Sequence, residues 1–453
     1  MAVDLGNEPA LGSNWLTYGG KLFAAVKELQ ATVASLSGSG GTGGLTLAGA
    51  VSSLTVQKRP VLMTGLVAGA DNTAALNNAF AAAQPYDTLV IPTGEWTHSG
   101  ALYVQAANPN VRIEGQGRMA KLVGTNARYG GLICRANGTS LIGINHTVVG
   151  ATSRGNGENF DDCPFAFDNC TDIVLEDLVS AGSRDAAFFV STVRRMRARD
   201  LVMKDSFADG FHVSNGSKDI TVAGIDGTNI GDDGVAVVSY TGDADVVERV
   251  KVTRVTITNG LARGISVVGG RNVEYHDVDL FRTRGAGVYV AHEQGDFNTR
   301  AVENVDISAV RARETNWDPS LDSGAFGLFN LVSGTTMKNV RIAGLHATGM
   351  RKQSNGMTYG LVKNAGGGGG KFAGVVLQDI TLDKGTAANA AIYIDNSINA
   401  TTVVKDGETY NSATGSGVYQ NDEGYKIYGN TALGTAGSTA VAPDIDVKRV
   451  RVV

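Results

Sequence analysis

Cysteine and proline are scarce in this chain, which has three cysteines, Cys134, Cys163 and Cys170, and eight prolines in 453 residues. Three irregularly spaced cysteines exclude a disulfide framework and a four-ligand zinc site, so we expect them to be small buried apolar side chains. Glycine, by contrast, occurs 60 times. Few prolines and many glycines are typical of a fold whose corners need small residues and positive φ.

An excess of positive charge and long apolar runs are also missing. Lysine and arginine number 39 against 44 acidic residues, a net charge of −5, and the scattered basic residues exclude a nucleic-acid footprint. No apolar run approaches the roughly 18 residues of a membrane span. Residues 1–6 carry neither a basic n-region nor an apolar h-region, so we expect synthesis in a cytoplasm without a Sec signal. The glycine run Gly366–Gly370 is not followed by a Lys-Ser/Thr pair, so we interpret it as a loop and not as a phosphate-binding site. We predict neither a cofactor nor a metal.

An eight-residue pattern, h-x-h-x-x-h-x-h with h mostly apolar, recurs nine times. Alternation within each half predicts strands with one buried face, and the two-residue break predicts a corner. Successive copies lie 23, 24, 30, 23, 32, 35, 35 and 70 residues apart, and the last interval leaves room for two degenerate turns. Such periods indicate a solenoid. The copies begin at Ile173, Met196, Ile220, Val250, Val273, Val305, Val340, Val375 and Ile445.

A second column of apolar pairs runs in step with the first, so each period contributes at least three short strands to three stacked parallel sheets. This predicts an all-β fold, a right-handed parallel β-helix. An antiparallel sandwich would instead need hairpin turns every 8 to 12 residues or so. The pairs are Phe165/Phe167, Phe188/Val190, Phe211/Val213, Val235/Val237, Ile265/Val267, Val288/Val290, Phe326/Leu328, Tyr359/Leu361 and Ile392/Ile394.

The N-terminal part divides into three segments before a body at 45–453. Residues 22–36 have a strict a/d seam and predict a coiled-coil stalk, although a helix docked on its own domain has the same pattern. A Gly/Ser linker follows at 37–44, and residues 1–21 are too few to fold alone, which indicates a docking segment. The seam consists of Leu22, Val26, Leu29, Val33 and Leu36.

The two ends of the body differ. Asp71-Asn72-Thr73 offers N-cap candidates for a helix over residues 74–83, and we expect this helix to cover the N-terminal end of the solenoid. Residues 88–96 then read as the first core strand. At the other end, residues 450–453 still carry the strand pattern, so we expect no comparable cap there.

Aspartates gather on neighbouring coils. Aligning the apolar pairs places Asp209 and Asp233 in one column about 4.8 Å apart, with Asp232 beside them. At least one of three such carboxylates should have a raised pKa. Glycoside hydrolysis requires such an acid, still protonated because its pKa is raised, beside an ionised base. Asp-Gly pairs also simply terminate turns, and this interpretation stays open. Outward positions nearby form a ladder suited to sugar rings, with Phe189, His212, Ser266 and Tyr289.

Two stretches resemble known families. Residues 70–76 and 89–96 are similar to the opening signature of the pectate-lyase-like superfamily, a capped helix followed by a strand ending in Pro-x-Gly-x-aromatic. The stalk resembles the anchors of bacteriophage tail spikes and tail fibres. That resemblance implies a homotrimer assembled in the host cytoplasm, located in the virion tail, attached to other tail proteins by its N-terminus and binding host surface polysaccharide.

The acidic segment resembles the polygalacturonases, whose strands read Asn-Thr-Asp-Gly and Gly-Asp-Asp-Cys. The resemblance implies an inverting hydrolase with Asp232 as general acid and Asp209 and Asp233 holding the water. Two departures are Arg263 in place of a histidine, and the stretch Arg282-Thr283-Arg284 in place of Arg-Ile-Lys, which keeps cationic character for an acidic sugar. We predict substrate binding by Phe189, His212, Arg263, Arg282, Arg284 and Tyr289. A non-catalytic receptor-binding fibre and a secreted polysaccharide lyase or hydrolase remain alternatives.

Overall fold

A computed structural model describes most of the chain from residue 60 onward. The predicted docking segment, stalk and linker lie outside the described residues. The described ranges are 60–155, 160–295, 297–318, 320–321, 323–349, 360–364, 370–383, 392–394, 402–405, 408–411, 418–420, 426–428, 434–435 and 445–452.

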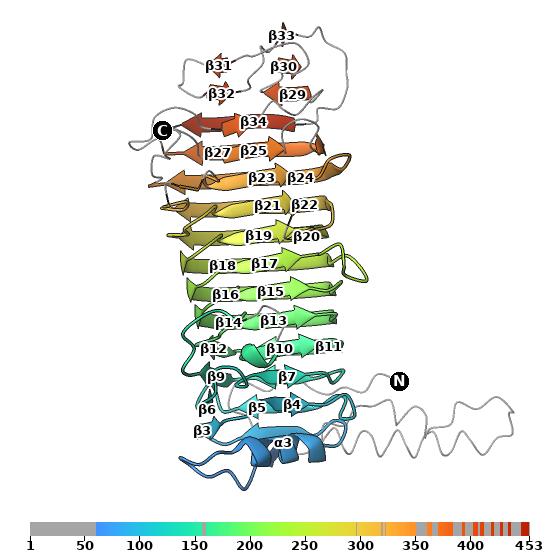
Figure 1. Ribbon diagram of the computed structural model, residues 1–453, viewed down its shortest axis with the longest axis vertical. Coiled ribbons are helices and arrows are strands. Elements are labelled where there is room, and N and C mark those ends of the chain that lie inside the picture. The colour runs from blue at the N-terminus through green and yellow to red at the C-terminus, as the bar shows by residue number, and fades with distance from the viewer. Residues whose placement is uncertain are drawn as a thin grey trace, which may run out of the picture. The chain divides into compact units, whose positions relative to one another are not determined.

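Two ladders of stacked strands run the length of the body (Figure 1). Within the described ranges one sheet has 21 strands and the other has 13, and neighbouring strands from β1 to β27 are parallel. The predicted right-handed parallel β-helix is therefore confirmed. The smaller sheet, sheet B, consists of β4 (Leu102–Val104), β7 (Leu132–Cys134), β10 (Phe165–Asp168), β13 (Phe188–Ser191), β15 (Phe211–Ser214), β17 (Val235–Val238), β19 (Ile265–Val268), β21 (Val288–His292), β23 (Phe326–Asn330), β25 (Gly360–Asn364), β28 (Ile392–Ile394), β31 (Val418–Gln420) and β32 (Lys426–Tyr428).

The larger sheet, sheet A, covers two faces of the solenoid because its long strands continue through a corner. Asp200, Gly224 and Arg254 occupy that corner on successive coils with φ of 55°, 92° and 55°, so a single left-handed residue bends each strand without ending the ladder. Three strand segments per coil thus make two hydrogen-bonded sheets rather than the predicted three. Sheet A consists of β1 (Pro60–Leu62), β2 (Thr88–Ile91), β3 (Gly94–His98), β5 (Arg112–Gly115), β6 (Ala120–Gly124), β8 (Ser140–Ile142), β9 (Ile144–Val148), β11 (Thr171–Glu176), β12 (Val179–Ala181), β14 (Arg194–Ser206), β16 (Lys218–Ile230), β18 (Glu248–Gly260), β20 (Gly270–Phe281), β22 (Val302–Arg313), β24 (Thr336–Thr348), β26 (Lys371–Ala373), β27 (Val375–Leu382), β29 (Thr402–Lys405), β30 (Glu408–Asn411), β33 (Gly434–Thr435) and β34 (Ile445–Val452).

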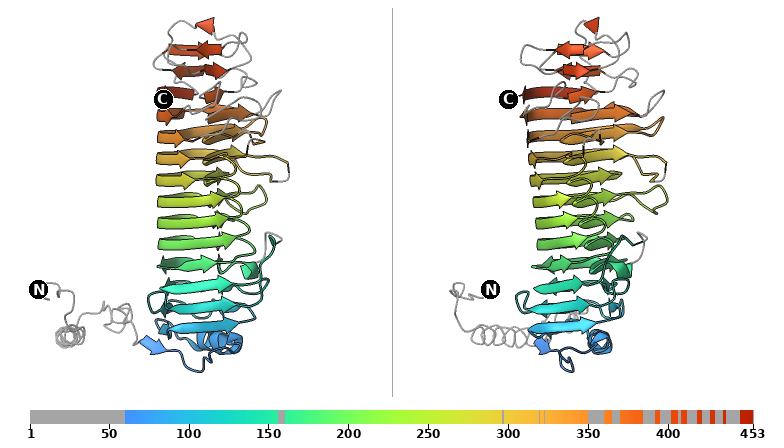
Figure 2. Two further views of the ribbon diagram at one scale, coloured as in Figure 1. Left: turned by 90° about the vertical axis from the view of Figure 1, so that its left-hand side faces the viewer. Right: turned by 60° about the vertical axis from the view of Figure 1, so that its left-hand side comes forward.

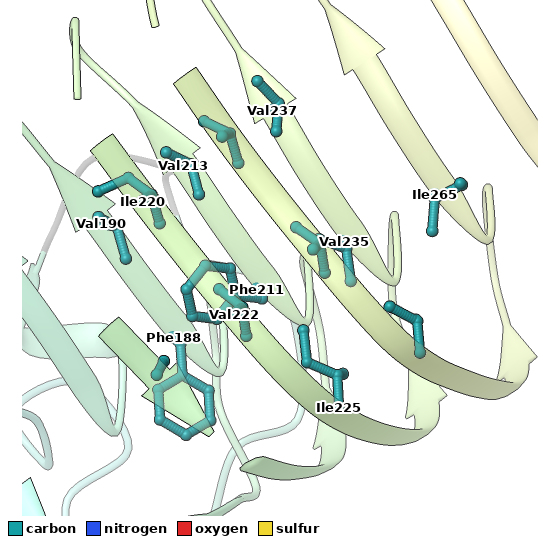
Figure 3. Packing of buried hydrophobic residues seen from close by; sticks show 14 of the residues in the cluster. Phe188, Val190, Phe211, Val213, Ile220, Val222, Ile225, Val235, Val237 and Ile265 are labelled. Carbon is teal, nitrogen blue, oxygen red and sulfur yellow. The ribbon is translucent and has the colours of Figure 1, made fainter. Parts of the chain in front are cut away.

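The core is a column of apolar side chains stacked coil upon coil (Figure 3). Phe211 pairs with Phe188 on one side and with Val235 on the other, and all three are fully buried. The Phe188 and Phe211 rings lie 6.0 Å apart. Burying each such side chain stabilises the fold by about 1.5–3 kcal/mol. The three cysteines are buried, as predicted.

One predicted pair in sheet B is wrong by one residue. Phe326 pairs with Gly360 and Leu328 pairs with Val362, so the inward positions are 360 and 362 rather than 359 and 361. A Cβ on Gly360 would lie 2.1 Å from the Phe326 ring. The missing side chain leaves room for that ring. The alignment was wrong by one residue because it placed the apolar residues at the inward positions, one of which is a glycine.

The C-terminal end also differs from the prediction. Strand β34 pairs directly with β27, so no degenerate turn separates the last two copies of the pattern in sheet A. On its other side β34 pairs with β29, which pairs antiparallel with β30. In sheet A, β34 therefore lies between β27 and β29, although it comes last in the chain. The antiparallel pair of β29 and β30 covers the edge of β34, which was expected to have no cap.

Helix α3 (Thr73–Ala82) lies across the other end of the stack, as predicted (Figure 2). Leu76 and Phe80 are buried against the core, and the Asn77 side chain bonds the edge strand β4, accepting from the Tyr103 N–H at 2.8 Å and donating to the Ala101 carbonyl at 2.9 Å. The predicted first core strand divides into β2 and β3 around Pro92 and Thr93. A short 3-10 helix, η1, spans Phe160–Asp162. Within the described ranges, no helix has the length and apolarity to cross a membrane.

Candidate functional site

The turns that lead into sheet B bring the predicted aspartates together. The Gly210 N–H donates to the Asp233 carbonyl and the Gly234 N–H to the Arg263 carbonyl, both at 2.9 Å. This ladder stacks Asp209, Asp233 and Arg263 in one column. Glycine is required next to them, because a Cβ on Gly210 would lie 2.4 Å from the carbonyl of the next coil.

Asp209, Asp232 and Asp233 form one cluster, with an oxygen from each within 4.8 Å of the others. Asp209 and Asp233 are buried, whereas the Asp232 side chain is 23% exposed. Both oxygens of Asp209 are engaged: Oδ2 lies 2.5 Å from His212 Nδ1, and Oδ1 accepts the Asp233 N–H at 2.9 Å. The cluster therefore contains two fixed carboxylates and one that solvent or substrate reaches.

The environment separates the pKa values of these carboxyl groups. Burial, together with the neighbouring charges of Asp209 and Asp233, raises the pKa of Asp232 to about 7. Burial acts in the same direction on Asp209, but the hydrogen bond and charge of His212 outweigh it and lower the pKa of Asp209. Asp209 in turn raises the pKa of His212 against the effect of burial. Near neutral pH a partly protonated Asp232 therefore lies beside an ionised Asp209.

Two arginines flank the cluster. Arg263 donates to Asp233 Oδ1 from its backbone N–H at 3.1 Å and from Nη1 at 3.4 Å, and its guanidinium lies over the Tyr289 ring at 4.3 Å. Its Nη2 also lies 3.7 Å from Oε1 of Glu293. Arg154 donates from Nη1 to Asp232 Oδ2 at 2.5 Å from a segment 78 residues earlier in the chain. The repeat pattern did not mark Arg154, because this residue lies outside the strands.

The predicted ladder forms one column of sheet B. Phe189 pairs with His212, and Ser266 with Tyr289, with Ala236 between the two pairs. Phe189 stacks on His212 at 4.9 Å. The prediction of an exposed ladder is wrong for three members, since His212, Ser266 and Tyr289 are 8%, 1% and 7% exposed. Arg263 covers Tyr289, and Tyr240 and Phe329 pack against the same apolar cluster.

Apolar surface nevertheless lies beside the carboxylates. Phe207 and Leu261 are 36% and 53% exposed, and each occurs two residues before a member of the Asp209–Arg263 column. Gly231 lies between them, where a Cβ would meet the Phe207 backbone at 2.4 Å. Sugar rings stack on apolar side chains of this kind. No feature of the repeat singled out these two residues.

Arg282 and Arg284 engage other carboxylates. Arg282 Nε lies 3.7 Å from Glu314, and Arg284 Nε lies 2.8 Å from Asp318. Both arginines follow β20, one coil beyond Arg263. The structure thus brings Arg263, and not these two, against the aspartates.

Comparisons with known proteins identify the fold but no family. No family model and no curated protein matches the chain. Among solved structures, it is similar to the catalytic unit of a GH87 α-1,3-glucanase from Streptomyces thermodiastaticus strain HF3-3, with 15% identity, a TM-score of 0.56, and coverage of 86% of this chain and 68% of that one. The Agl-KA catalytic domain gives 15%, 0.56, 87% and 68%. The mannuronan C-5 epimerase AlgE6 A-module from Azotobacter vinelandii gives 15%, 0.50, 86% and 97%. The chain therefore shares a parallel β-helix with domains of polysaccharide-modifying enzymes.

Proposed function

We propose that the protein hydrolyses a polysaccharide, with Asp232 as the general acid and Asp233 and Asp209 orienting the attacking water. The observation that carries this proposal is the cluster of three aspartates with an oxygen of each within 4.8 Å of the others, in which the pKa of Asp232 is raised to about 7 and that of Asp209 is lowered. A carboxyl group that is still partly protonated near neutral pH can give its proton to the leaving glycosidic oxygen. An ionised carboxylate beside it can accept a proton from water.

The contacts divide the work among the three aspartates. Asp209 has both oxygens engaged by His212 and by the Asp233 N–H, which suits a positioning role. The donors named for Asp233 all bind Oδ1, which leaves Oδ2 as the proposed water acceptor. Asp232 is the most exposed of the three, and its turn is hydrogen-bonded to the turns that carry Phe207 and Leu261, on which a sugar ring can stack.

The glucanase structures give further support. Three of them are variants in which one aspartate, at position 1045, 1068 or 1069 of those chains, is replaced by alanine, in complex with nigerose or tetrasaccharides. The intervals, 1068 − 1045 and 1069 − 1068, are 23 and 1. The same intervals separate Asp209, Asp232 and Asp233 (232 − 209 and 233 − 232).

The stereochemistry of the reaction is a separate question. Inverting glycosidases usually hold their carboxyl groups about 6.5–9.5 Å apart and retaining ones about 5–5.5 Å apart. One oxygen from each carboxylate of this cluster lies within 4.8 Å of the others, which is below the inverting range. Inversion therefore rests on the polygalacturonase resemblance, and proton NMR of the first anomer released tests it.

The activity test compares wild type with Asp232→Asn on a panel of bacterial capsular polysaccharides, lipopolysaccharides and α-1,3-glucan. We expect the variant to release reducing ends about 100 to 10,000 times more slowly, because it lacks the general acid, while it still binds the polysaccharide. Asp226→Asn, at an exposed position of β16, is the matched control and should keep full activity. Wild-type protein that cleaves nothing while binding a glycan normally would instead identify a non-catalytic receptor-binding fibre.

We further propose that this activity belongs to a homotrimeric tail spike of a virion. The support is the heptad seam of residues 22–36, the Gly/Ser linker of 37–44 and the resemblance of this arrangement to tail-spike anchors. Light scattering of the full-length protein after size exclusion should give three times the chain mass of 47.0 kDa. A monomer that releases an unsaturated product would point instead to a secreted lyase.

A further inference from the structure

The uneven spacing of the repeat creates a cavity beyond the C-terminal ends of strands β17 and β21 of sheet B. The pattern copies at Ile220, Val250, Val273 and Val305 are separated by 30, 23 and 32 residues. The two longer coils contain the segments 239–247 and 293–301, the second described except for residue 296, and these segments follow β17 and β21 of sheet B. The short coil between them joins β19 to β20 through Gly269 alone.

The two long segments meet above the short coil. The Thr241 N–H donates to the Asn298 carbonyl at 2.9 Å, and the Arg300 N–H donates to the Ser239 carbonyl at 2.8 Å. The Arg300 side chain also donates to the Tyr240 carbonyl at 3.1 Å. Gly269 has φ of +78°, and a Cβ there would lie 2.7 Å from the Ser239 carbonyl oxygen. These contacts hold the walls of the cavity in place without a ligand.

The cavity measures about 570 Å³, within the range of roughly 300–1,000 Å³ for small-molecule sites. His292, at 4% exposure, lies at its wall with Nδ1 3.1 Å from the Thr335 hydroxyl. Glu293 also lines it and lies 3.7 Å from Arg263, which binds Asp233. One arginine therefore links the cavity to the carboxylate cluster.

The lining favours a neutral ligand rich in hydroxyl groups. Its three carboxylates, Asp245, Glu293 and Glu303, outnumber the guanidinium groups of Arg271 and Arg300. The two arginines of the lining are already engaged, Arg271 by Glu303 at 3.5 Å and Arg300 by the Tyr240 carbonyl at 3.1 Å. Burial lowers the pKa of His292 and keeps it neutral, so an anion would meet no uncommitted cation among these groups. Lys218, Arg263 and Arg271 already engage these carboxylates, at 2.6, 3.7 and 3.5 Å. Hydroxyl groups both donate and accept hydrogen bonds, so they can bind carboxylates and guanidinium groups that already pair with each other. The apolar lining residues are Val246, Ala301 and Val332.

We propose that this cavity binds a neutral sugar unit of the polysaccharide whose neighbouring linkage lies at Asp232. The inference rests on the proposed function for its choice of ligand. Glu293 lines the cavity and contacts Arg263, and Arg263 contacts Asp233, so a chain that occupies both places passes over these two residues. A substrate long enough to fill both places gains contacts that a short fragment lacks.

Ala301→Trp tests the proposal, because Ala301 is exposed and lines the cavity without touching the aspartates. We expect the KM for the intact polysaccharide to rise at least tenfold, with kcat within twofold of wild type and an unchanged pH profile. Ala107→Trp, in an exposed turn after β4, is the control. Val332→Phe fills the cavity from another wall and serves if Ala301→Trp does not fold. A folded variant of either kind with wild-type KM overturns the proposal.

Binding measured separately from cleavage distinguishes this proposal from the proposed function. If wild type binds a polysaccharide without cutting it and Ala301→Trp still weakens that binding tenfold, the hydrolase proposal fails and the cavity proposal stands. If wild type binds no glycan, both fail. The affinity should change less than twofold between 0.05 and 0.5 M NaCl. Affinity that falls fivefold or more with salt would indicate an anionic ligand and overturn the chemical class proposed.

Discussion

Replacing Arg154 by methionine removes the cation that holds Asp232 partly in its charged form. Arg154 Nη1 lies 2.5 Å from Asp232 Oδ2, and its charge and hydrogen bond lower the pKa of Asp232 against burial and the neighbouring carboxylates. Methionine keeps the unbranched stem but has no charge. The pKa of Asp232 should therefore rise above about 7 in the variant.

The size of this rise follows from Coulomb's law with a correction for solvent. Two charges about 4 Å apart interact by about 4 kcal/mol at an effective dielectric constant of about 20. The Arg154 side chain is 51% exposed, and pairs exposed to this extent keep only about 1 kcal/mol after screening. Since 1.36 kcal/mol corresponds to one pKa unit, we expect a rise of about one unit.

The assay is the pH dependence of kcat/KM on the polysaccharide that the wild type cleaves. A general acid must be protonated, so wild-type activity should fall as pH rises through about 7, and in Arg154→Met this fall should move to about pH 8. Arg154→Lys keeps the charge and should keep the wild-type profile. Arg195→Met breaks an exposed ion pair with Asp172 on sheet A and is the control. A fall that moves to lower pH in Arg154→Met, or does not move, would refute this account of Asp232.

Two further predictions concern stability. Gly234→Ala should lower the free energy of unfolding by about 1–3 kcal/mol in urea titrations, because the new Cβ would lie 2.4 Å from the Gly264 carbonyl. Gly242→Ala has open space around it and should cost nothing comparable. His98 and His146 are fully buried with their Nε2 atoms 3.1 Å apart, and burial lowers the pKa of both. The two histidines contribute their full stability above the unfolded pKa of about 6.5. As pH falls below that value the unfolded chain takes up protons and the free energy of unfolding drops, by at most about 1.4 kcal/mol per histidine at pH 5.5. A His98→Leu/His146→Leu protein that keeps the full acid sensitivity would disprove this assignment.

Periodicity by itself determined the coil register of most of the body. Inward residues must alternate and stack, because a one-residue slip would turn every apolar side chain outward. This is why the pairing of Phe211 with Val235, and with it the stacking of Asp209 on Asp233, was predictable. The pattern was misleading where a glycine occupied an inward position, at Gly360.

The tertiary structure decided what surrounds the aspartates. Arg154 contacts Asp232 although it lies 78 residues earlier in the chain. Segments 239–247 and 293–301 meet across a short coil, as the Thr241–Asn298 hydrogen bond shows. Neither contact can be predicted from the periodic spacing of buried residues. Loop residues carry no alternation that reports their direction, and their positions depend on hydrogen bonds made after the coils have stacked. Periodic burial of apolar side chains thus determined where the carboxylates stack, whereas the folded loops set the pKa of Asp232, the burial of Tyr289 and the shape of the neighbouring cavity.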